Sequence, residues 1–260
     1  MKSRFLCTGR SGWRWCWLML LSLSVGLFTG CAAPPAAVAL APTPGKLTWS
    51  AQQQAAWQAL PLPGKVATRY LLEEPALASA QGQRAALKAD ARSSASMLRT
   101  PVRVEADALG QLGFSWMVPA LIAGADMGVR GLDDSPVRLI LAFEGDRNQF
   151  SGKNSMLNEL ARLVTGEERP YATRMYVWCN QRPVGSVIQN PRTDRIRKIV
   201  VESGPQGLMQ WRNYVRNIRA DFEQAFGEPP GALVAIGLMT DSDNTHSNTV
   251  AWYGPIGLRQ

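Results

Sequence analysis

The residues best suited to chemistry lie in one polar segment near the C-terminus, residues 240–249, with the sequence TDSDNTHSNT. Asp241, Asp243, Asn244 and Thr245 place four oxygen-bearing side chains within five residues. Hard cations such as calcium prefer oxygen ligands of this kind, and Asp241 and Asp243 would be the charged ligands of such a site. The same side chains would suit hydrogen bonds to the hydroxyl groups of a ligand such as a glycan.

The spacing of this segment departs from the EF-hand calcium loop. His246 stands where that loop needs glycine, and Trp252 stands where it needs a terminal glutamate. Apolar runs flank the segment on both sides, and Asp and Asn in hairpin loops commonly hydrogen-bond their own backbone. Three hypotheses therefore stay open: a solvated hairpin loop, a loop that contacts a glycan or other ligand, and a calcium site.

Catalytic motifs are absent from the sequence. His246 is the only histidine, and no G-x-S-x-G, H-E-x-x-H or C-x-x-C pattern occurs. No catalytic residue is singled out, and no cofactor other than calcium is indicated. A hydrolase that works through two carboxylates remains an alternative, because such enzymes need only an Asp/Glu pair across a cleft. Its candidate carboxylates are Asp126, Asp133, Asp134, Glu144, Asp146, Glu202, Asp241 and Asp243.

Aromatic side chains supply candidate stacking faces for sugar rings. Trp178 and Trp252 are favoured because each lies opposite a more aliphatic face of its expected strand, whereas Trp211 is expected to pack inside. The expected ligand-binding set is therefore these two tryptophans together with the four residues of the polar segment.

Charge and cysteine content narrow the class of protein. Four of the 28 basic residues precede residue 15 and none of the 20 acidic ones does, which leaves a small excess of 24 basic over 20 acidic side chains. Such a balance does not indicate a nucleic-acid partner. Beyond Cys31 the only cysteine is Cys179, which lies in an apolar run and is expected to be a buried, inert thiol.

The first 30 residues have the features of a signal peptide. A 12-residue apolar run, 17–28, is too short to span a membrane, which takes about 20 residues. The following Phe28-Thr29-Gly30-Cys31 resembles the bacterial lipobox. The resemblance implies a lipid on Cys31 and attachment to a membrane. Because Ala32 follows the cysteine, it also implies the periplasmic face of the outer membrane. The alternative is a plain secretory signal and a soluble periplasmic or secreted protein.

Residues 31–45 then form a Pro/Ala-rich tether, and residues 46–260 are expected to form a single domain. Short runs with alternating hydrophobicity, separated by turn residues, predict a mostly-β antiparallel sandwich with one or two packed helices. The expected strands are 65–74, 84–91, 95–105, 112–118, 137–145, 173–180, 196–203, 233–240 and 249–258. The expected helices are a short one within 47–60, one at 155–164, and the clearest at 209–226.

Several stretches between residues 62 and 258 resemble a bacterial family of domains of unknown function, numbered three-zero-four-seven. They are Leu62-Pro63-Gly64-Lys65, Thr68, Tyr70, Ala95-Ser96, Phe143-Glu144-Gly145-Asp146, Tyr176-Val177-Trp178, Val200-Val201-Glu202-Ser203-Gly204, Asp221, Ala225-Phe226-Gly227-Glu228 and Met239-Thr240-Asp241-Ser242-Asp243-Asn244-Thr245. The resemblance implies no particular activity and no catalytic residues.

More loosely, the last two strands around the polar segment are similar to the end of galactose-binding-like jelly rolls. That similarity implies a binding module. We therefore expect an envelope lipoprotein with a non-catalytic binding domain for a glycan or another envelope component. The alternatives are the carboxylate hydrolase and a structural or assembly lipoprotein that partners an envelope protein and binds no small ligand.

Overall fold

The computed structural model describes residues 46–49, 56–73 and 85–259. The chain divides into two units, residues 1–38 and 39–260, and every described residue belongs to the second. That second unit has its own hydrophobic core, so we expect residues 39–260 to fold without the preceding ones. The expected signal peptide, Cys31 and the whole of the tether lie outside the described residues.

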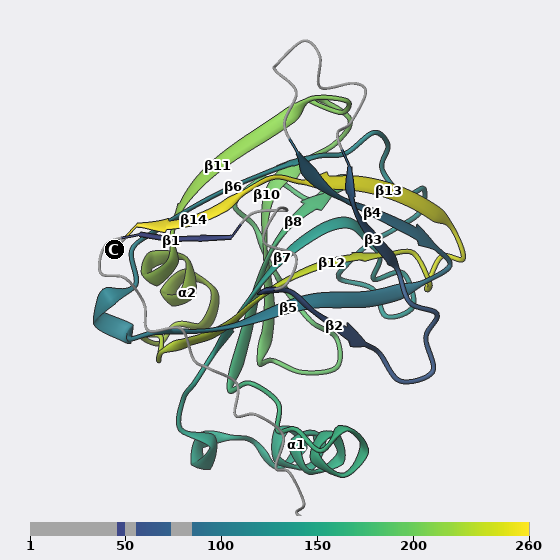
Figure 1. Cartoon of the computed structure of the whole chain (residues 1–260). Coiled ribbons are helices and arrows are strands. Elements are labelled where there is room, and N and C mark those ends of the chain that lie inside the picture. The colour runs from purple at the N-terminus through teal and green to yellow at the C-terminus, as the bar shows by residue number, and fades with distance from the viewer. Residues whose placement is uncertain (1–45, 50–55, 74–84, 260) are drawn as a thin grey trace, which may run out of the picture. The chain divides into compact units, whose positions relative to one another are not determined.

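Two sheets dominate the second unit (Figure 1). The first sheet contains, in spatial order, β1 (Lys46–Trp49), β14 (Ile256–Arg259), β6 (Gln111–Met117), β13 (Asn248–Tyr253), β4 (Ala86–Arg92) and β3 (Arg69–Glu73), with β11 (Trp211–Asn217) also paired to β6. The second contains β2 (Gln58–Pro61), β5 (Ala95–Val104), β12 (Leu233–Asp241), β7 (Ser135–Phe143), β8 (Ala172–Cys179), β10 (Ile196–Ser203) and β9 (Val187–Gln189). Two helices, α1 (Gly152–Thr165) and α2 (Ile218–Phe226), accompany them.

The connectivity is that of a jelly-roll sandwich. Strands β4 to β7, and again β10 to β13, alternate between the two sheets. Pairing is antiparallel throughout the described strands except between β8 and β10, which run parallel. The prediction of a mostly-β sandwich with one or two packed helices is confirmed.

The inner faces of the two sheets meet in one large core. Along β7, the predicted alternation is confirmed, because Val137, Leu139, Leu141 and Phe143 all lie in this core with at most 1% exposure. The alternate residues of β7 face outward, yet all of them are also buried. At one end of the strand they are covered by the loop that precedes it, which contributes Met127 to a second apolar cluster over β8 and β10.

The predicted helix at 209–226 is wrong over its first half. Residues 211–217 form β11, and the helix begins only after Asn217, whose side chain accepts a hydrogen bond from the backbone of Ala220. Trp211 and Tyr214, which a helix would place on one face, pack into different clusters on opposite faces of β11. Pairing with β6 therefore overrides the helical spacing. The predicted helix end at Gly227 is confirmed, since Gly227 caps α2 with a φ of 73°.

Other boundaries also differ from expectation. The short helix expected within 47–60 is wrong at both ends, where the chain forms β1 and β2. The last expected strand is divided into β13 and β14 at Pro255, which lacks the N–H that a continuous strand would donate. The helix expected at 155–164 is confirmed as α1.

Candidate functional site

The polar loop after β12 is held by ion pairs rather than left in solvent. Asp241 is 3% exposed, and its carboxylate accepts two hydrogen bonds from the Arg138 guanidinium, at 2.9 Å from Nε and 2.8 Å from Nη2. Its Oδ1 also accepts the backbone N–H of Ser135 at 3.0 Å. Both oxygens of Asp241 are therefore occupied by groups of the protein itself.

Arg138 links Asp241 to a second buried pair. Its Nη2 lies 3.1 Å from Asp133, whose two carboxylate oxygens each lie 2.7 Å from the Lys198 ammonium. Burial lowers the pKa of Arg138, but the carboxylates of Asp241 and Asp133 outweigh burial and hold that pKa above its ordinary value. Burial lowers the pKa of the Lys198 ammonium to about 8. The four side chains form one charged network beneath the loop.

Asp134 accepts hydrogen bonds from the tip of the loop. One of its oxygens accepts the Asn244 side-chain amide at 2.8 Å, and the other accepts the Thr245 hydroxyl at 2.6 Å and backbone N–H at 2.7 Å. Asp243 forms an ion pair with Lys65. The hairpin hypothesis assumed bonds within the loop, whereas these bonds run to other segments of the chain.

The donor set does not fit a calcium ion. Oxygens of Asp134, Asp241 and Asp243 lie within 4.8 Å of one another, the grouping expected of a cation site. However, Asp134 and Asp241 already accept hydrogen bonds on both oxygens, and the Arg138 guanidinium stands against the cluster. A divalent cation would have to displace these donors and face that positive charge. Calcium at Asp241 and Asp243 stays a prediction that these contacts do not support.

The two predicted tryptophan platforms are not brought together. Trp178 is 0% exposed, packs in the core, and donates its Nε1–H to the Gly204 carbonyl at 3.0 Å, so its choice as a stacking face is wrong. Trp252 is half-buried on the first sheet, next to Met117 and with the Lys88 ammonium 5.6 Å from its ring centroid. Neither ring contributes to a surface shared with the polar loop.

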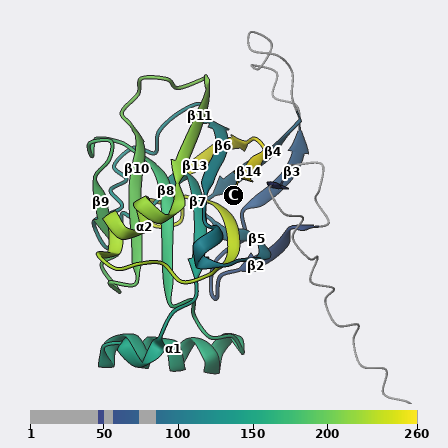
Figure 2. The ribbon, with the colours of Figure 1, turned by 90° about the vertical axis from the view of Figure 1, so that its left-hand side faces the viewer.

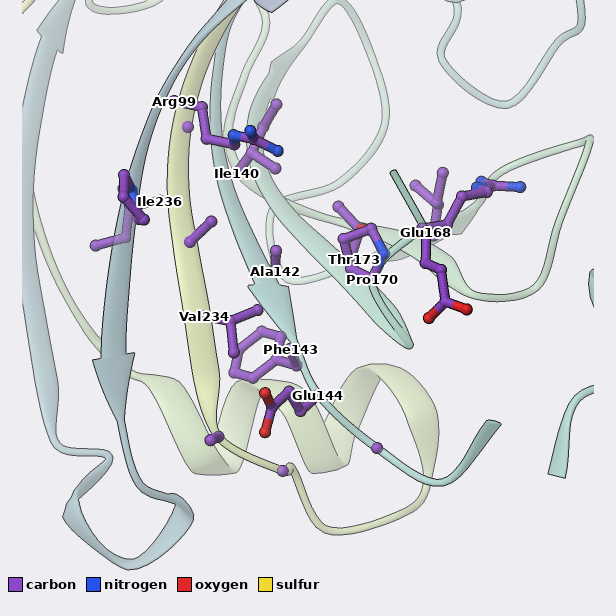
Figure 3. A pocket seen from close by; sticks show the side chains of 18 of the residues that line it. Arg99, Ile140, Ala142, Phe143, Glu144, Glu168, Pro170, Thr173, Val234 and Ile236 are labelled. Atoms are coloured by element: carbon purple, nitrogen blue, oxygen red, sulfur yellow. The ribbon is translucent and has the colours of Figure 1, made fainter. Parts of the chain in front are cut away.

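A large cleft lies instead on the outer face of the second sheet, as Figure 3 shows from close by. Its volume is about 960 Å³. Strands β5, β12, β7 and β8 supply the floor, and the chain just after β7 and just before β8 supplies one wall.

Small residues on adjacent strands leave space above the floor of the cleft. Gly237 lies between Arg99 of β5 and Ile140 of β7, and Ala235 lies between Pro101 and Ala142. A Cβ atom on Gly237 would stand only 3.3 Å from the Leu98 carbonyl oxygen and 3.4 Å from Cβ of Ile140, so only glycine fits there without a shift. The remaining floor is aliphatic or sulfur-containing, with Met97, Ile140, Met175 and Val234.

Four arginines line the rim, and three of them are paired. Arg99 makes a two-bonded ion pair with Glu167, at 2.7 and 3.2 Å, which connects β5 to the segment after α1. Arg103 contacts Glu144 at 2.7 Å, and Arg147 lies 3.5 Å from Glu168.

The fourth arginine, Arg169, differs. Within the part of the chain that the structure describes, no acceptor or aromatic ring contacts its half-buried guanidinium, and burial lowers its pKa. Arg169 was not among the residues singled out from the sequence. Its isolation depends on which side chains surround it in space, so no sequence pattern marks it.

Most of the carboxylates predicted for a hydrolase lie outside the cleft. Glu105, Glu144 and Glu168 line it, and of these only Glu144 was a predicted candidate. Asp241 is the buried carboxylate of the polar loop, but it lies outside the cleft, in its pair with Arg138. Most of the other candidates are engaged elsewhere: Asp126 with Arg182, Asp133 with Lys198, Asp134 with the loop tip, Asp146 with its own turn, and Glu202 with Arg212 and Tyr214.

Solved structures similar to this chain include carbohydrate-binding modules and glycoside hydrolases, all at low identity. A cellulase derived from that of Rhodothermus marinus is 9% identical, with a TM-score of 0.37 over 81% of this chain and 98% of the other. A family 11 carbohydrate-binding module from Clostridium thermocellum is 8% identical, with a TM-score of 0.36 over 83% and 95%. The glycoside hydrolase domain Endo-D from Streptococcus pneumoniae is 8% identical, with a TM-score of 0.32 over 78% of this chain but only 21% of the other.

No curated protein matches the chain. A family match, in contrast, extends over residues 55–257, nearly the whole of the described sandwich. The resemblance seen in the sequence is thereby confirmed: the chain belongs to the family described as protein of unknown function (DUF3047).

Proposed function

We propose that this chain is a non-catalytic binding domain of the cell envelope, and that the cleft on the second sheet is its ligand site. The cleft itself carries the proposal. Its volume of about 960 Å³ is at the upper end of the range of about 300–1,000 Å³ found for small-molecule sites. Its floor is formed by hydrogen-bonded strands, so the site exists before any ligand arrives.

The envelope location is the second part of the proposal. It rests on the signal peptide, on lipidation of Cys31, and on the Pro/Ala-rich tether that follows. The lipid would attach the protein to the outer membrane, facing the periplasm, and unlipidated export to the periplasm is the alternative. Among the helices that the structure describes, none is long and apolar enough to cross a membrane.

Binding without catalysis is proposed because the cleft offers contact surface but no matched acid and base. General acid catalysis by a carboxyl group needs a raised pKa in the cleft, next to a second, ionised carboxylate. The described cleft carboxylates, Glu105, Glu144 and Glu168, have side chains that are 46–59% exposed and are each paired with an arginine.

Filling the cleft tests the proposal. Ala235 lies half-buried on the floor, so Ala235→Phe places a ring where the ligand would lie. Ala220→Phe is the matched control, because Ala220 is exposed on α2 away from the cleft. Thermal melting of residues 39–260 would be followed with oligosaccharides, fatty acids and envelope extracts. A ligand that binds the folded state raises the melting temperature.

We expect at least one of these additions to raise the melting temperature of the native protein and of Ala220→Phe, but not that of Ala235→Phe. If nothing raises it, or if Ala235→Phe keeps the full rise, the cleft is not the ligand site and the proposal fails.

A further inference from the structure

We infer that the cleft takes an anionic amphiphile, with an acyl chain along its aliphatic floor and a carboxylate or phosphate head group held by Arg169. The inference rests on the proposed function, because it assigns a ligand class to that same cleft. Three independent features of the described residues carry it: the floor, the unpaired arginine and the neighbouring helix.

The floor suits hydrocarbon better than sugar. Met97, Ile140, Met175 and Val234 present methyl, methylene and thioether groups. Among the described residues that line the cleft, Phe143 is the only aromatic one, and it is fully buried, so its ring face is not available for stacking. Thr173 has the only neutral polar side chain in this described lining. A sugar needs several hydrogen-bond partners, whereas an acyl chain needs only apolar surface removed from water.

The head group has one well-placed partner. Arg99, Arg103 and Arg147 already form ion pairs with Glu167, Glu144 and Glu168, at 2.7, 2.7 and 3.5 Å. Arg169 has no such partner among the described residues, although it is partly withdrawn from water.

Burial without a counter-charge lowers the pKa of Arg169, which shows that its surroundings disfavour the positive charge. An anion in the cleft would supply the missing charge. Arginine is well suited to this, because its planar donors match the two oxygens of a carboxylate or phosphate group.

Helix α1 adds an apolar surface next to this wall. Its polar residues Asn154 and Asn158 are the buried ones, and the Asn158 side-chain oxygen accepts the backbone N–H of Arg169 at 2.9 Å. Four of its apolar residues, Met156, Leu160, Leu163 and Val164, are exposed instead, by 55–80%, whereas Leu157 and Ala161 are half-buried.

This arrangement is the reverse of an ordinary surface helix, which turns its apolar stripe inward. Figures 1 and 2 show α1 beyond the ends of β7 and β8. The chain next to those strand ends supplies the cleft wall. An apolar stripe in that place suits contact with a lipid surface from which an amphiphile would enter.

Calorimetric titration of residues 39–260 with decanoate monomers tests the inference. Decyltrimethylammonium has the same chain with the opposite charge, acetate has the head group without the chain, and cellotetraose represents neutral glycans. The variant is Arg169→Gln. Its matched control is Arg192→Gln, an exposed arginine outside the cleft lining.

We expect decanoate to bind at least ten times more tightly than decyltrimethylammonium, and acetate not to bind measurably. Loss of one charge-assisted interaction in Arg169→Gln should weaken decanoate binding by about 10- to 100-fold, with no change in Arg192→Gln. Equal binding of the two charged amphiphiles, or unchanged decanoate binding in Arg169→Gln, would overturn the inference.

Titration with cellotetraose distinguishes a failure of this inference from a failure of the proposed function. If cellotetraose binds, decanoate does not, and Ala235→Phe abolishes the binding, the ligand class is wrong but the cleft is still the site. If no probe binds, both proposals fail. Sedimentation with phosphatidylcholine vesicles containing phosphatidylglycerol distinguishes the two sources of the head group. Binding that depends on Arg169 assigns the site to a membrane phospholipid, and its absence beside decanoate binding assigns it to a free carboxylate.

Discussion

Replacing Asp241 by asparagine should destabilise the domain by removing a charge from a buried pair. The Arg138 side chain is only 3% exposed, and its guanidinium donates two hydrogen bonds to the Asp241 carboxylate. Asparagine keeps the shape of the side chain, but it cannot balance the charge, and its amide group would face the guanidinium donors. The variant therefore leaves Arg138 inside the protein with only Asp133 to oppose it.

The expected size follows from the burial of both partners. Breaking a buried ion pair by removing one partner costs about 3–5 kcal/mol. The lower value is expected for Asp241→Asn, because Asp133 remains 3.1 Å from Arg138. For a domain of this size, about 3 kcal/mol corresponds to a fall of about 6–12 °C in the melting temperature.

Urea unfolding of residues 39–260 at pH 8, where the native carboxylate is ionised, gives the measurement. Asp243→Asn is the matched control. Its partner Lys65 is 44% exposed, so that pair should contribute no more than about 1 kcal/mol. The double variant Arg138→Met/Asp241→Leu should recover part of the loss, because no buried charge is left unpaired. A loss below about 1 kcal/mol in Asp241→Asn, equal to that of the control, would refute the description of this network as structural.

Two further predictions concern buried groups outside the cleft. Burial lowers the pKa of Lys198 to about 8, whereas its value in the unfolded chain is about 10.4. Between these two pH values the unfolded state binds more protons than the folded state. The free energy of unfolding should therefore rise with pH in this range. We expect a gain of about 2 kcal/mol from pH 7.5 to 9.5 relative to Lys198→Met, and parallel profiles for the two proteins would contradict it. Cys179 is 3% exposed and burial raises its pKa to about 11, so in residues 39–260 it should react with Ellman's reagent only after denaturation. Rapid reaction in the native state would show that the thiol is accessible.

Secondary structure was predictable where the local pattern and the tertiary packing agree. The alternation in residues 137–143 holds because one face of β7 lies in the core of the sandwich. In residues 211–217 the two disagreed: aromatic residues at helical spacing indicated a helix, but the segment pairs with β6. A single sequence does not show which strand edge is free to receive such a segment, so this pairing could not be predicted.

For the polar loop, too, the sequence predicted one feature and missed another. Its composition identified Asp241, Asp243, Asn244 and Thr245 as residues with a special role, and the structure places all four in one cluster of ion pairs and hydrogen bonds. Their role was beyond the sequence, because it depends on partners more than 100 positions away.

The stretches that carry the family resemblance partly explain this cluster. Lys65 meets Asp243, the Thr68 hydroxyl donates to the Thr240 carbonyl at 2.8 Å, and the Tyr70 hydroxyl contacts both Ser96 and Thr240. Segments far apart in the chain thus converge on the ends of β5 and β12. The polar segment that the sequence indicated as a binding site thus connects distant parts of the sandwich through hydrogen bonds and ion pairs.

By itself, the sequence determined the class of fold and the family, because alternating hydrophobicity and turn residues act locally along each strand. The expected export signal has the same local origin. Only the tertiary structure decided where a ligand has room. The cleft arises from small residues on adjacent strands, Gly237, Ala235 and Ala142, which become neighbours through pairing. Arg169 stands out only because other carboxylates are already paired with Arg99, Arg103 and Arg147. The cleft and the unpaired charge of Arg169 both depend on which residues become neighbours in space, so neither exists until the sheet has formed.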